Sequence, residues 1–192
     1  ICSIHDSLSQ PCVFFLKRCS IYHWSIMEPY FLLRNFSKPF KGFLLAFLFV
    51  LSVGYFTGLS FVAQTDSNHP SGIVENYNGN EDSEEVLVMK FKKGQREMLT
   101  IVHTHVLSIG FIFALLGLLV WGTQISTKWK TFLTIEPFCS IIITFGGIYL
   151  IWLEYTAMAY VVMISGILMT LSFIAGAVVV CLDLIKSPIE SH

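Results

Sequence analysis

The 192-residue chain is 54% hydrophobic and only 13% charged, and its formal net charge is −1. Soluble globular domains carry about 25% charged residues, so this composition excludes an ordinary soluble protein and indicates one that is covered by lipid. A nearly neutral chain also lacks the basic surface that holds a nucleic-acid backbone, and we expect no nucleic-acid partner. Its five cysteines show no C-x-x-C spacing, which argues against a disulfide framework and a zinc site.

Residues 1–42 form an expected N-terminal cytoplasmic segment. The first methionine is Met27, so the sequence leaves open whether residues 1–26 belong to the native protein. The apolar stretch within them is too short to be the core of a signal peptide.

Four apolar stretches are long enough to cross a bilayer, which takes about 20 helical residues. They are residues 43–63, 98–121, 132–153 and 157–182. The polar, acidic residues 64–97 are expected to form an extramembrane loop, whereas the two later connections are short and require antiparallel hairpins. The sequence therefore predicts an all-α fold, a polytopic membrane protein whose domain 43–182 is a four-transmembrane-helix bundle, with a C-terminal tail at 183–192.

Basic residues near the ends of the spans predict the orientation, because they gather on the cytoplasmic side. One side of the predicted bundle carries Arg34, Lys38, Lys41, Lys128, Lys130 and Lys186. The other side carries Lys90, Lys92, Lys93 and Arg96. The larger group favours a multi-pass protein of the inner membrane with both termini inside the cell.

Small residues at helical spacing mark the faces on which transmembrane helices pack closely. The first span contains Gly54 and Gly58, and the second contains Gly110, Ala114 and Gly117. We expect these five residues to lie at contacts between helices of the bundle.

Two histidines near the start of the second span are the strongest candidates for a chemical role, because ionisable side chains in apolar spans usually face the bundle interior. At 100° per residue, His103 shares a face with Gly110, Ala114 and Gly117, and His105 points nearly the opposite way. Their i, i+2 spacing does not let both bind one metal ion, so no metal site is predicted.

The depth of His103 is compatible with a haem site. His103 lies about 7–8 Å inside its span, and Met163 lies about 9 Å inside the fourth span from the same side. A b-type haem held by His103 or His105 with Met163, or by histidines from two subunits, is one interpretation. The simpler interpretation is a histidine that hydrogen-bonds a backbone carbonyl, a lipid headgroup or Glu154.

Two glutamates, Glu136 and Glu154, fall on one helical stripe of the third span, at opposite ends of the membrane. About 27 Å apart, they are too distant for a paired-carboxylate site and suit at most the two mouths of a proton path. Glu136 precedes Pro137, a pattern typical of a first helical turn, which favours an interfacial position. Asp183 and Lys186 are expected to form an exposed pair at the end of the last helix.

The runs GIVENYNGNE (72–81), MKF (89–91) and IVHTHVL (101–107) resemble a family of small bacterial four-helix integral membrane proteins. That family has a Gly-Asn-Glu loop and a His-x-His motif at the start of its second helix, and the resemblance covers residues 43–182. It implies the fold and no activity. Some similar proteins carry a histidine in a Ser-Gly-Ile-x-His stretch of the last helix, where this chain has Met169 after Ser165-Gly166-Ile167-Leu168.

No phosphate loop, nucleophile elbow, catalytic triad or zinc-protease motif occurs, which favours a protein that is not an enzyme. The leading hypothesis is an accessory or assembly subunit of a membrane complex, a respiratory one included, whose partners are the lipid bilayer and other subunits. One alternative is a small electron-transfer subunit that binds haem b. Another is a proton or metal-ion carrier that uses His103, His105 and Glu154.

Overall fold

The computed structural model describes residues 32–81 and 88–187. Its elements are a 3-10 helix η1 (Leu33–Asn35) and the α-helices α2 (Lys38–Gln64), α3 (Pro70–Asn78), α4 (Gln95–Trp121), α5 (Thr127–Trp152) and α6 (Met158–Ile185). Four of them, α2, α4, α5 and α6, are long and apolar enough to span a membrane. The described part of the chain contains no strand, and the predicted all-α, multi-pass fold is confirmed.

The long helices extend beyond the apolar stretches of the sequence. α5 begins at Thr127 rather than at 132, because Lys128 and Lys130 are good helix formers and the preceding Ser126 is extended. α2 begins at Lys38 and has a proline in its first turn, where the missing amide costs nothing. Helix propensity therefore extends the helices beyond the apolar residues that the hydropathy pattern identifies.

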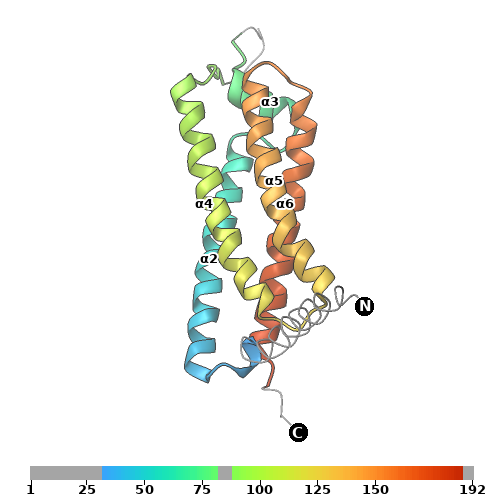
Figure 1. The fold of residues 1–192 in the computed structure, drawn as a ribbon. Coiled ribbons are helices and arrows are strands. Elements are labelled where there is room, and N and C mark those ends of the chain that lie inside the picture. Colours follow the sequence, from blue (N-terminus) through green and yellow to red (C-terminus); the bar gives the residue numbers. More distant parts are fainter. Residues whose placement is uncertain (1–31, 82–87, 188–192) are drawn as a thin grey trace, which may run out of the picture.

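α5 and α6 pack side by side as an antiparallel hairpin (Figure 1) and contribute most of the buried hydrophobic residues. Glycine lets the helices approach closely at two points. A methyl group on Gly147 would lie 2.6 Å from Val162 of α6, and one on Gly176 would lie 3.2 Å from Leu116 of α4. α5 is the most buried of the four spanning helices and α2 the least. The outer faces of α2 and α4 are therefore left for lipid or for another protein.

The loop expected at 64–97 contains a helix that the sequence analysis did not predict. α3 lies at the end of the bundle where α5 is joined to α6 (Figure 1). It ends at Gly79, whose φ of +84° is unfavourable for any residue with a side chain. Beyond it the chain pairs with a second segment: Asn80 donates its amide to the Lys90 carbonyl at 2.9 Å, and Lys93 donates to the Tyr77 carbonyl at 3.1 Å. Residues 65–81 and 88–94 are called the cap below.

An ion pair ties η1 to α6 at the opposite end of the bundle. The guanidinium of Arg34 lies 2.7 Å from Oδ1 of Asp183, and the two side chains are only 19% and 5% exposed. The predicted exposed pair of Asp183 with Lys186 is therefore wrong. Asp183 faces inward, and Lys186 instead accepts a hydrogen bond through its carbonyl from Lys41 at 3.1 Å.

Candidate functional site

The two histidines of α4 lie in different surroundings, and the prediction that His103 is on the close-packed face is wrong. His103 is exposed on the outer surface of α4, and no hydrogen bond to it occurs in residues 32–81 and 88–187. His105, expected to point the opposite way, is also exposed, but its ring lies 5.2 Å from that of Phe145 on α5. Its Nδ1 also lies 2.8 Å from the Ile101 carbonyl, the backbone hydrogen bond of the simpler interpretation.

Met163, the other candidate haem ligand, packs against the core of the bundle from α6. His103 faces outward, so the two side chains meet different environments, and the described residues show no contact between them. No group of three or more His, Cys, Asp or Glu that could hold a metal ion occurs in the described part of the chain.

The five small residues expected at helix contacts also lie in different surroundings. A methyl group on Gly117 would lie 3.3 Å from Thr134, so this glycine is at the contact of α4 with α5. A methyl group on Gly54, Gly58 or Gly110 would meet nothing within 4 Å, and Ala114 is half-buried. The prediction that Gly54, Gly58 and Gly110 pack inside this bundle is therefore wrong for the described structure.

A polar seam, defined as Glu136, Ser140 and Thr144 of α5 with Ser165 and Ser172 of α6, follows the contact between the two helices. The serine hydroxyls of Ser140 and Ser172 each donate to one carboxylate oxygen of Glu136. A hydrogen bond of 2.7 Å links the hydroxyls of Thr144 and Ser165. All four hydroxyl residues are buried and Glu136 is half-buried. Hydrogen bonds of this kind hold transmembrane helices together, and here they fix the register of the hairpin.

Glu136 lies deeper in the bundle than its sequence context indicates. Because α5 begins at Thr127, Glu136 is about 13 Å along the helix axis. Pro137 is inside α5, where it lacks the amide that would bond to the Leu133 carbonyl. The first-turn position indicated by the Glu-Pro pattern is therefore wrong. The seam from Glu136 to Thr144 covers about 12 Å near the middle of α5.

Tyr55 brings α2 to the same region. Its ring stacks on Phe173 of α6, with the centroids 3.9 Å apart, and its hydroxyl lies 3.3 Å from the Thr170 hydroxyl. Tyr55 is buried and close enough to Glu136 for the two groups to interact electrostatically. Sequence periodicity gave no sign of this contact, because hydrophobic residues around Tyr55 are spread over every face of α2.

Glu154, the second glutamate, lies at the cap end of α5 and takes part in no intramembrane site. It is exposed and forms an ion pair with Lys92, whose ammonium group also lies 5.8 Å from the centre of the Trp152 ring. Trp152 donates its indole N–H to the Lys93 carbonyl at 2.7 Å. Asn78 of α3 adds a hydrogen bond to the Ile151 carbonyl at 2.7 Å. These contacts hold the cap on the end of the hairpin.

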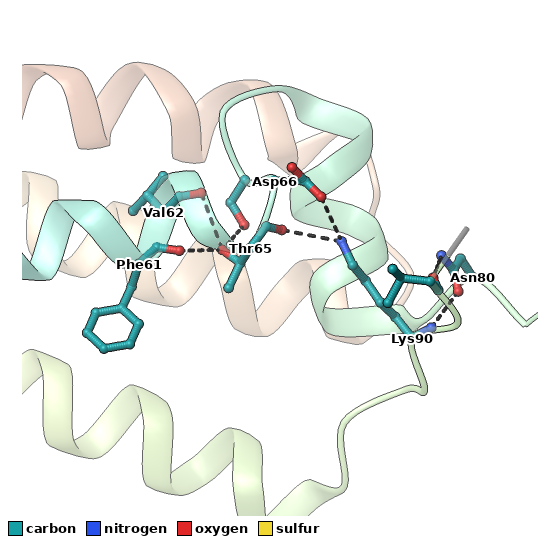
Figure 2. Close-up of polar contacts among 8 residues, drawn as sticks. Phe61, Val62, Thr65, Asp66, Asn80 and Lys90 are labelled. Carbon is teal, nitrogen blue, oxygen red and sulfur yellow. Dashed lines mark hydrogen bonds and ion pairs between the residues drawn. The ribbon is translucent and has the colours of Figure 1, made fainter. Parts of the chain in front are cut away.

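Lys90 contacts Thr65 and Asp66, the two residues that directly follow α2 (Figure 2). Its ammonium group donates to the Thr65 carbonyl at 3.3 Å and lies 3.9 Å from the Asp66 carboxylate. Its backbone amide donates to the Asn80 side chain at 2.7 Å, and the Asn80 amide group donates to the Val88 carbonyl at 3.1 Å. Asn80, which belongs to the Gly-Asn-Glu run, therefore acts as a backbone clamp, a role that the run itself does not reveal.

Comparison with known protein families gives a match to the membrane domain of the chain. A family model described as a transmembrane helical domain, Aq_1264_TM, matches residues 67–191. No curated protein matches the chain, and no solved structure matches it. The matched region contains α3, α4, α5 and α6, and it begins after the end of α2. Since this is well over half of the 192 residues, the chain belongs to this family of transmembrane helical domains.

Proposed function

We propose that the protein is a non-enzymatic accessory or assembly subunit of a membrane complex, and that the outer face of α4 contacts another subunit. The observation that carries this proposal is the exposure of His103 on that face. An imidazole inside a transmembrane helix usually faces the bundle interior or a polar partner, because hydrocarbon offers it no hydrogen bond.

Three neighbouring polar residues of α4, which are exposed like His103, support the proposal by contrast. Thr100 and Thr104 donate their hydroxyls to carbonyls of α4 itself, at 2.8 and 2.7 Å, and Ser108 does so at 3.4 Å. These hydroxyls are satisfied within the helix and can face lipid at little cost. The His103 ring, with no such bond in the described structure, is the group on this face that needs a partner.

The test places a photo-crosslinking amino acid at His103 in the native membrane. The matched control is the same amino acid at Ile167, an exposed residue of α6 at nearly the same distance along its helix from the cap end. We expect position 103 to form an adduct with a different polypeptide and position 167 to react with lipid. Lipid adducts alone at 103, or adducts only with a second copy of this chain, would contradict the proposal.

The position of His103 also restricts the haem alternative. Met163 packs into the core, so a haem on His103 would take its other axial ligand from a neighbouring chain. An optical spectrum of the intact complex, oxidised and reduced, tests this: a b-type band lost in His103→Ala would favour electron transfer. The basic residues at the η1 end support the proposed inner-membrane location with both termini inside the cell.

A further inference from the structure

We infer that Glu136 is a proton-binding site in the middle of the bundle, where its carboxyl group takes up and releases a proton between the hydroxyls of Ser140 and Ser172. The inference is independent of the subunit role proposed above. It concerns a different helix pair and does not need a partner on α4.

The first argument is position. Glu136 is about 13 Å along α5, and its partner Ser172 lies 14 residues after Met158 in the 28-residue helix α6, which is the midpoint of that helix. Glu136 is therefore about two and a half helical turns from the start of α5 and farther from its end, inside a helix long and apolar enough to span a membrane. Ionisable groups at such depth usually mark proton or ion sites.

The second argument is the absence of a counter-ion. The four ion pairs among the described residues involve Asp66, Glu97, Glu154 and Asp183, and none involves Glu136. The titratable group that faces it is Tyr55 of α2, which is uncharged at neutral pH. From α6 it meets the uncharged hydroxyl of Ser172, and α4 contacts α5 nearby through Gly117 and Thr134.

The third argument is the chemistry of the hydrogen bonds. Glu136 is half-buried, and even partial removal of a carboxylate from water without a cation is costly, whereas a carboxylic acid has one donor and spare acceptor sites. A serine hydroxyl can donate and accept, so the same pair of serines satisfies the charged form with two donated bonds and the neutral form with one donated and one accepted. The site therefore has hydrogen-bond partners in both protonation states without moving a helix.

The fourth argument is the continuation of the seam toward the cap. The hydroxyls of Thr144 and Ser165, 2.7 Å apart, lie two helical turns of α5 beyond Glu136. At Gly147, by contrast, α5 and α6 approach closely without any polar group, so close packing of the two helices does not require the hydroxyls of the seam. The seam thus places exchangeable hydroxyl protons beside and beyond the carboxyl group, within the apolar core.

The experiment is infrared spectroscopy of the full chain in lipid nanodiscs over a pH series. We expect a carboxylic-acid C=O band that disappears as the pH is raised and that is lost in Glu136→Gln. The matched control is Glu154→Gln, which removes the exposed glutamate and should leave the band unchanged. Ser140→Ala keeps the acid but removes one hydrogen bond, so it should shift the frequency of the band, a result available even if Glu136→Gln does not fold.

Carbodiimide labelling gives a second readout. Dicyclohexylcarbodiimide reacts with a protonated carboxyl: the acid proton goes to a carbodiimide nitrogen, the carboxyl oxygen adds to the central carbon, and the acyl group then moves from oxygen to nitrogen. We expect the adduct on Glu136 and its loss as the pH rises. A carboxylate band alone at every pH would overturn the inference, as would protection from labelling by Na⁺ but not K⁺ at constant pH, which would indicate a sodium site.

Discussion

The ion pair between Arg34 and Asp183 should be a main determinant of stability, and Arg34→Met tests this. The substitution leaves the Asp183 carboxylate with no cation while it stays 95% buried, and its Oδ2 atom already has no hydrogen-bond partner. Removing one partner of a buried pair costs about 3–5 kcal/mol, since the remaining charge keeps its desolvation penalty. We expect a loss of that size in the free energy of unfolding.

The assay is reversible unfolding of the purified protein in mixed micelles, followed by circular dichroism. The matched control is Lys92→Met, which breaks the pair with Glu154, whose side chains are 42% and 66% exposed. An exposed pair contributes about 0–1 kcal/mol. The double variant Arg34→Met/Asp183→Leu should be more stable than Arg34→Met, because no unpaired charge remains. Equal losses for Arg34→Met and Lys92→Met, or additive losses in the double variant, would refute the reasoning.

Three predictions concern the cap. Gly79→Ala should lower the free energy of unfolding by about 1–2 kcal/mol, because φ at this position is +84°. The loss should be larger still because the new Cβ would lie 2.8 Å from the Lys90 carbonyl. The control Gly94→Ala should change the free energy of unfolding little, since a Cβ there would meet nothing within 4 Å. Asn80→Ala removes the acceptor of the Lys90 amide, so hydrogen exchange at that amide should accelerate, and an unchanged rate would contradict the clamp. Burial raises the pKa of Tyr77 above 10.0, partly offset by a hydrogen bond from Asn76, so the folded state holds this proton more tightly than the unfolded state. Stability should be constant below pH 10 and fall as the pH rises through the folded pKa, and Tyr77→Phe should remove that decline in a pH series of unfolding curves.

Hydropathy was sufficient to predict the number and order of the membrane helices, because a span needs only a long apolar run. It placed their ends less well. Lys128 and Lys130 lie within the first turn of α5, since a lysine at a helix end can extend its side chain to the membrane surface without breaking the helix. α3 was missed because only nine residues form it, and its short apolar pattern is weak within a polar loop.

The candidate site was harder to predict, because it depends on which helix faces which. At 100° per residue Ser140, four residues after Glu136, falls on the same face of the helix, and the two side chains are hydrogen-bonded. This spacing gives no information on the partner helix, so Ser172 was not linked to Glu136, and Asp183 was assigned to a neighbour in sequence rather than to Arg34, 149 residues away. His103 was misplaced because the small residues chosen as its reference face do not all lie at helix contacts: a methyl group on Gly110 would meet nothing within 4 Å.

The attachments of α2 show how the bundle is divided. The helix is held at its η1 end by the hydrogen bond from Lys41 to α6, in the middle by Tyr55 on Phe173, and at the cap end by Lys90. Between these points its surface is largely exposed, with Phe49 70% accessible, and the family match starts after it. Most of the buried hydrophobic residues lie on α4, α5 and α6, and α2 adds Leu44, Leu48 and Tyr55 to them. Loss of the three attachments should therefore free α2 while the other three spanning helices, with the polar seam between α5 and α6, keep their packing.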